Sequence, residues 1–96
     1  MTSDTGKSLT LAVRITGRVQ GVAFRAWTRG EATARGLSGW VRNMPDGSVR
    51  ALLHGPESSV RGMVGAMRDG PPAARVDGVE TAPGDAPGGP GFRILR

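Results

Sequence analysis

The chain begins, after a short polar segment, with a regular alternation of apolar and polar or small side chains. This alternation has a period of two and predicts a half-buried β-strand over residues 9–16. The preceding residues 1–8 lack the pattern, so we expect a flexible N-terminal tail there and a single domain over residues 9–96. The apolar positions of the predicted strand are Leu9, Leu11, Val13 and Ile15.

Two later segments have the composition or spacing of helices. Residues 22–35 are mostly good helix formers, and Gly36 follows as a candidate C-terminal cap. Gly30 inside this segment costs about 1 kcal/mol relative to alanine, so we expect this helix to depend on packing against a sheet. The second helix opens around Pro56 and ends at Gly70. Its apolar side chains fall at i, i+3, i+4 and i+7, which predicts a buried stripe of Val60, Met63, Val64 and Met67.

Four further segments are typical of strands. The turn signal over residues 45–48 (Pro-Asp-Gly-Ser) joins two of them into a hairpin, and Asp46 is interpreted as a turn residue. Residues 81–91 are almost all turn formers and predict a mobile loop. These predicted strands are 37–44, 49–54, 74–80 and 92–95.

The order of the elements is β-α-β-β-α-β, followed by a short extra strand. This order predicts an α+β fold, the ferredoxin-like split βαβ sandwich, in which two helices cover one face of an antiparallel sheet. A chain of 96 residues suffices for one such domain with one modest core.

The composition is basic and lacks cysteine. The formal net charge is +5, which indicates either attraction to anions or simply a solvated, arginine-rich surface; both interpretations stay open here. The absence of Cys excludes a disulfide framework or a thiolate site and fits a cytoplasmic location. The start of the chain has no apolar signal region, and no apolar run approaches membrane-spanning length, so we expect no membrane association.

The most suggestive stretch lies between the first strand and the first helix, from Gly17 to Arg25. A glycine-bracketed turn before a helix directs backbone N–H groups toward one point, where the helix N-terminus adds partial positive charge. Arg25 falls in the first helical turn, and its planar fork of donors matches two oxygens of a phosphate or carboxylate. The alternative is a tight turn without a ligand. The stretch is neither a dinucleotide-binding GxGxxG loop nor a P-loop.

A second candidate, Asn43, closes the strand before the 45–48 turn. Its amide either faces a site or bonds nearby backbone to shape the turn, and the residue by itself favours the latter. The lone His54 is interpreted as structural, because no His, Cys or carboxylate cluster has metal-ligand spacing. Trp27 and Trp40 are interpreted as packing residues; the alternative is that either one lies at the rim of a substrate pocket.

Two motifs together resemble the acylphosphatase family. The first is Gly17-x-Val19-Gln20-Gly21-Val22-x-Phe24-Arg25, and the second is Gly39-Trp40-Val41-Arg42-Asn43-x-x-Asp46-Gly47-x-Val49. Shorter matches follow at Gly55-Pro56-Glu57, at Gly70-Pro71-Pro72-Ala73-x-Arg75-Val76 and at Phe92-x-Ile94, so the resemblance extends from about Leu9 to Leu95.

The resemblance implies an enzyme that hydrolyses the carboxyl–phosphate bond of small acylphosphates to a carboxylate and inorganic phosphate. It places the catalytic residues at Arg25 and Asn43. It also implies that the enzyme needs no metal and no cofactor and forms no phosphoenzyme. We expect inorganic phosphate or sulfate to occupy the loop, and we expect a monomer. The phosphate-cradling loop that the resemblance implies consists of Arg18, Val19, Gln20, Gly21 and Val22.

The sequence departs from the family pattern at two places. Arg50 stands where the family often has an acidic residue, and residues 81–91 form a longer, Gly- and Pro-richer loop than is usual. The alternative function is a non-catalytic anion- or nucleic-acid-binding module of the same fold. The chain has only four aromatic residues and no RNP1-like pattern, so we expect no nucleic-acid partner.

Overall fold

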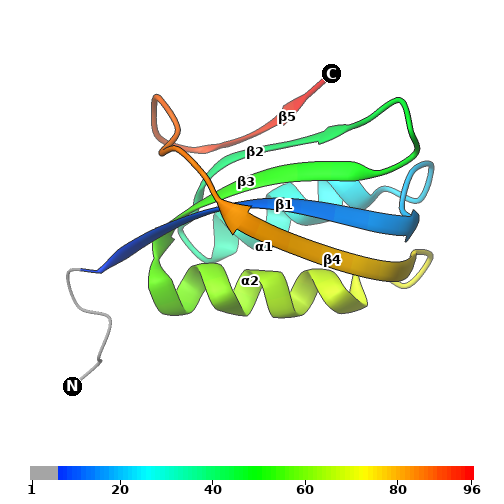
Figure 1. The fold of residues 1–96 in the computed structure, drawn as a ribbon, viewed down its shortest axis with the longest axis horizontal. Coiled ribbons are helices and arrows are strands. Elements are labelled where there is room, and N and C mark those ends of the chain that lie inside the picture. The colour runs from blue at the N-terminus through cyan, green and yellow to red at the C-terminus, as the bar shows by residue number, and fades with distance from the viewer. Residues whose placement is uncertain (1–6) are drawn as a thin grey trace.

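The computed structural model describes residues 7–96, which form one five-stranded sheet and two helices (Figure 1). The predicted tail falls mostly on residues 1–6, which lie outside the described residues, and the first strand already begins at Ser8. The strands are β1 (Ser8–Arg18), β2 (Ser38–Asn43), β3 (Val49–Pro56), β4 (Arg75–Pro83) and β5 (Phe92–Leu95). The helices are α1 (Phe24–Ala34) and α2 (Glu57–Asp69).

The sheet order is β4-β1-β3-β2-β5, which confirms the predicted ferredoxin-like α+β fold. The first four strands of this order pair antiparallel, as predicted. The antiparallel prediction is wrong for β5, which pairs parallel to β2. The link from β4 to β5 stays at one end of the sheet while it crosses to the opposite edge (Figure 1), so β5 runs opposite to β4 and therefore alongside β2.

β4 is longer than the sequence pattern indicates. Residues 81–83, predicted as the start of the loop, pair with residues 11–13 of β1, so the loop covers only 84–91. Pro83 is tolerated because β4 is an edge strand, where a missing N–H breaks no inner ladder. Beyond it, the Gly84 N–H donates to the Thr10 carbonyl at 3.2 Å, which holds the start of the loop against β1.

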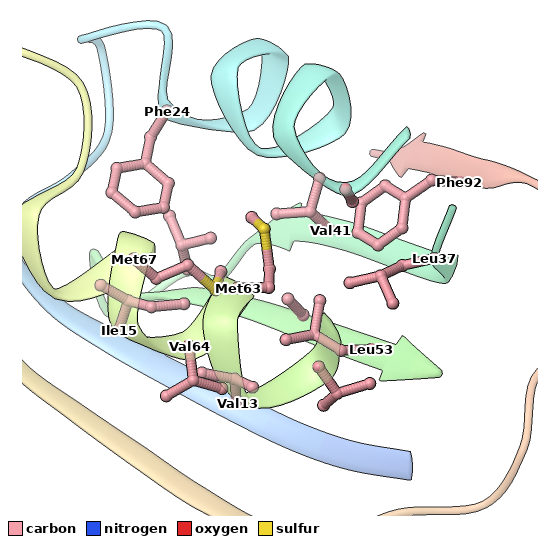
Figure 2. Close-up of a cluster of buried hydrophobic side chains, with 14 of the residues drawn as sticks. Val13, Ile15, Phe24, Leu37, Val41, Leu53, Met63, Val64, Met67 and Phe92 are labelled. Carbon is pink, nitrogen blue, oxygen red and sulfur yellow. The ribbon is translucent and has the colours of Figure 1, made fainter. Parts of the chain in front are cut away.

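The core lies between the sheet and the two helices (Figure 2). Met63 and Met67 of α2 are fully buried there, as the helical stripe predicted. α1 contributes a narrower stripe of Phe24, Thr28 and Ala32. The ring of Trp27 lies 5.4 Å from that of Phe24, so its predicted packing role is confirmed.

Two glycines provide a matched test of the packing. Gly39 of β2 has φ +137°, and a Cβ there would collide with the Leu52 carbonyl oxygen of β3. Gly30 of α1 has open space around its Cα. We expect Gly39→Ala to lower the free energy of unfolding by about 3 kcal/mol or more. Gly30→Ala should raise it by about 0.5–1 kcal/mol. Urea unfolding followed by circular dichroism measures both, and equal stabilities of the two variants would contradict the packing described here.

Candidate active site

Three strand ends meet at one end of the sheet. β1 and β2 both pair antiparallel with β3 and therefore run in the same direction, and β5 pairs parallel with β2. The C-terminal ends of β1, β2 and β5 are consequently neighbours. This topology brings together the segment after Arg18, the side chain of Asn43 and the last residues of the chain.

The connection from β1 to α1 is shaped by left-handed backbone. Gly17, Gly21 and Ala23 have φ of +121°, +74° and +61°, and Ala23 is the N-cap residue of α1. Helical backbone cannot pass through these positions, so α1 starts at Phe24 rather than at the predicted residue 22. The N-terminus of α1 has no side-chain capping hydrogen bond, so its first amide groups are available to an anion.

A cavity of about 490 Å³ opens where these elements meet. The structure places Arg25, in the first turn of α1, and Asn43, at the end of β2, on its wall. Val19 and Gly21 of the predicted phosphate loop also line it, whereas Arg18, Gln20 and Val22 do not. The lining residues are Val19, Gly21, Ala23, Phe24, Arg25, Ala26, Asn43, Ile94 and Arg96.

The positive charge of Arg25 is not neutralised by a carboxylate in the described part of the chain. Arg25 is half-buried and belongs to none of the ion pairs formed by residues 7–96. Its guanidinium therefore adds to the partial charge of the helix N-terminus beside it. The cavity is an electrostatically favourable place for a phosphate-sized anion. The ion pairs are Arg14–Asp46, Arg14–Glu80, Arg35–Glu31, Arg61–Glu57 and Arg75–Asp77.

Asn43 is not the residue that shapes the β2–β3 turn. Its Oδ1 is buried and has no hydrogen-bond partner among the described residues. Asp46 holds the turn instead, because its Oδ1 accepts from the Ser48 N–H at 2.9 Å and from the Ser48 hydroxyl at 2.6 Å. A buried polar atom without a partner costs about 1–3 kcal/mol. Asn43 thus lines the cavity and carries a buried acceptor that no described residue uses.

The contacts that hold the turn also lower the pKa of the Asp46 carboxyl. The hydrogen bonds from Ser48, and then the bond from Arg14 Nη2 at 3.0 Å, hold the pKa of this carboxyl well below its usual range. Asp46 is therefore ionised at neutral pH and does not act as a general acid there. It also lies outside the cavity lining.

The side chain of Gln20 reaches away from the loop to which it belongs. Its Nε2 donates to the Met44 carbonyl at 2.8 Å and to the Ser48 carbonyl at 2.9 Å, both in the β2–β3 turn. The resemblance placed Gln20 among the phosphate-binding residues but gave no indication of this contact. The side-chain amide of Gln20 links the loop after β1 to the turn after Asn43.

Ile94 and Arg96 line the cavity, although sequence reasoning did not select them. Their presence follows from the parallel pairing of β5 with β2, which places Leu95 opposite Arg42. Ile94 belongs to the Phe92-x-Ile94 match to the family, but that match did not place it at the site.

Other chemistry-bearing side chains lie outside this site. His54 of β3 is half-buried with its Nδ1 2.7 Å from the Thr10 hydroxyl of β1, in agreement with a structural role. Among residues 7–96, no group of three or more His, Cys, Asp and Glu side chains could hold a metal ion. Neither α1 nor α2 is long and apolar enough to cross a membrane.

Comparison with known proteins matches most of the chain to one family. A family model, Acylphosphatase, matches residues 11–94. An acylphosphatase from Rhodospirillum rubrum is 57% identical over 83 residues, covering 86% of this chain and 91% of the relative. One from Rhizobium meliloti is 52% identical and covers 100% of this chain and 99% of its own. The structure of an acylphosphatase from Coxiella burnetii superposes with a TM-score of 0.89 at 30% identity, covering 99% and 100% of the two chains.

Proposed function

The chain belongs to the acylphosphatase family and is an acylphosphate phosphohydrolase, and we propose that Arg25, Asn43 and the 18–22 loop carry out its reaction. The observation that carries this proposal is that Arg25 and Asn43 lie on the wall of the same cavity, together with Val19 and Gly21. The non-catalytic alternative considered from the sequence is not favoured by the relatives.

Arg25 and the loop amides bind the phosphoryl group. Phosphoryl transfer passes through a loose transition state with its charge spread over the equatorial oxygens, so positive charge and N–H donors around those oxygens lower the barrier. The Arg25 guanidinium is a rigid fork of donors that suits two such oxygens. The exposed Arg18 and the half-buried Val22 lie outside the cavity lining. They flank Val19 and Gly21 in the chain, and we propose that they contribute by holding that part of the loop in place.

Asn43 positions the attacking water. Its unpartnered Oδ1 accepts a hydrogen bond from the water and directs the water oxygen toward phosphorus, in line with the leaving carboxylate. The water oxygen forms the new P–O bond while the bond between phosphorus and the acyl oxygen breaks. The electron pair of the broken bond leaves with the carboxylate. One water proton passes to a phosphate oxygen. The carboxylate is a good leaving group and needs no general acid.

We also propose which anions the site binds, that the reaction needs no metal or cofactor, and in which compartment and oligomeric state the enzyme acts. Inorganic phosphate, the product, and sulfate, its isostere, present the oxygens that the loop and Arg25 bind. Positive charge comes from the protein itself, so we propose a reaction without metal or cofactor. We also propose that the enzyme is a monomer. The absence of Cys is consistent with the cytoplasm.

Hydrolysis of benzoyl phosphate by the purified protein tests this proposal. We expect turnover that excess chelator does not change, and competitive inhibition by inorganic phosphate. Circular dichroism on the same sample verifies that the protein is folded. The proposal fails if the folded protein shows no turnover, or if chelator abolishes turnover and added metal restores it.

A further inference from the structure

Gln20 does not line the cavity, so binding of an anion there does not explain the contacts of its side chain. Val19 and Gly21, its neighbours on both sides, line the cavity, but Gln20 is half-buried outside it. Its side-chain amide has two N–H donors, and the Met44 and Ser48 carbonyls accept from this one group at 2.8 and 2.9 Å. A residue in the middle of the anion-binding turn thus uses its side chain on a different segment of the protein.

The two acceptors lie at the two ends of the turn that follows Asn43. Met44 follows Asn43 directly, and Ser48 precedes Val49, the residue paired with Asn43 across the β2–β3 ladder. Gln20 therefore holds both ends of the turn that begins where the Asn43 strand ends. Since Val19 and Gly21 of the loop and Asn43, directly before the turn, line one cavity, this contact links two parts of the cavity wall.

The turn does not need Gln20 in order to form. The Met44 carbonyl also accepts from the Gly47 N–H at 3.1 Å, and the Ser48 carbonyl accepts from the Met44 N–H at 2.8 Å. Asp46 closes the turn with its bonds to Ser48. The turn is thus complete by its own contacts, and the Gln20 bonds are additional links to the loop.

We propose that Gln20 is a positioning residue that couples the phosphate-binding loop to Asn43 and fixes the Asn43 amide relative to the bound phosphoryl group. The inference rests on the proposed function, in which Asn43 directs the water. Small errors in the placement of reacting groups are costly: a displacement of about 1 Å can lower a rate about 10²-fold. Loss of two hydrogen bonds outside the cavity should therefore lower kcat while it leaves phosphate binding nearly intact.

A double-mutant cycle between Gln20→Met and Asn43→Ala tests the coupling. Methionine keeps the length of the side chain and removes its donors, and Gln20→Asn serves as a second variant in which the donor is one methylene too short. We expect each to lower kcat for benzoyl phosphate about tenfold. In the Asn43→Ala background, Gln20→Met should change kcat by less than about twofold, because the residue through which it acts is gone. The inhibition constant for phosphate should stay within about threefold of the wild-type value.

Arg29→Met is the matched control, because Arg29 is exposed on α1 and lies outside the cavity lining. The inference would be overturned if the kcat losses of Gln20→Met and Asn43→Ala multiplied in the double variant. It would also be overturned if the inhibition constant for phosphate rose in step with the loss of kcat.

The ¹⁵N-resolved side-chain amide signal of Asn43 provides a readout that does not depend on catalysis. It should shift in Gln20→Met and stay in place in Arg29→Met. An unmoved signal would overturn the coupling. If the signal shifts but Asn43→Ala retains wild-type kcat, the coupling stands and the proposed role of Asn43 fails.

Discussion

Replacing Arg25 by alanine is expected to lower kcat for benzoyl phosphate about 10³-fold. Removal of one donor from a preorganised anion site costs about 10²–10³ in kcat, and an arginine that stabilises a phosphoryl transition state is worth about 10³–10⁵. Arg25 is a strong candidate for such a loss, because no carboxylate of residues 7–96 is ion-paired with it and the N-terminus of α1 lies beside it. Steady-state kinetics and the inhibition constant for phosphate measure the effect, and phosphate should bind more weakly as well.

Arg25→Lys separates charge from geometry. Lysine keeps the positive charge but lacks the planar fork of donors, so we expect it to recover only a small part of the lost rate. Arg29→Ala removes an exposed arginine of the same helix and should leave kcat within about twofold of the wild-type value. A folded Arg25→Ala variant with wild-type kcat would remove Arg25 from the mechanism.

Asn43→Ala is expected to lower kcat by about 10²-fold or more, while the inhibition constant for phosphate changes little. The residue orients water rather than phosphate, so its removal costs positioning of the nucleophile and not ground-state binding. The β2–β3 turn is held by Asp46 and by its own backbone hydrogen bonds, so the alanine variant should keep its fold. Denaturant unfolding on the same protein establishes that stability is retained.

A variant without the side-chain carbonyl of Asn43 distinguishes a role in water positioning from a role in packing. Asn43→Leu fills a similar volume without an acceptor, so its kcat should be as low as that of Asn43→Ala. If the leucine variant regained most of the activity, Asn43 would be a packing residue and the water-positioning argument would be wrong.

The local pattern of the sequence was sufficient for most of the fold. Alternation predicted β1, the helical stripe predicted the burial of Met63 and Met67, and the Pro-Asp-Gly-Ser signal predicted the β2–β3 turn. These features depend on neighbours within a few residues. Their physical cause is therefore visible in a short window of the chain.

The parallel pairing of β5 could not be predicted from local sequence patterns. Residues 92–95 are too few to encode a partner or a direction, and both follow from the path of the 84–91 loop around the end of the sheet. As a result Ile94 and Arg96 were not selected as cavity residues. The extension of β4 to Pro83 was missed for a related reason, because pairing with β1 outweighed the turn propensity of residues 81–83.

The candidate site was predictable in its residue types but not in its side-chain directions. The two motifs selected Arg25 and Asn43, and the topology brings both to one cavity. The motifs could not show that the Gln20 side chain leaves the loop for the Met44 and Ser48 carbonyls. That contact joins segments more than twenty residues apart, and no local rule describes it.

Hydrolysis of benzoyl phosphate in ¹⁸O-labelled water tests the central claim most directly. If the loop and Arg25 hold the phosphoryl group while Asn43 directs water to phosphorus, the bond between phosphorus and the acyl oxygen breaks. The enzymatic label then appears in inorganic phosphate, and the benzoate stays unlabelled after correction for spontaneous hydrolysis. Label in the benzoate would mean that water attacks the carbonyl carbon, which would contradict the roles given to Arg25 and Asn43.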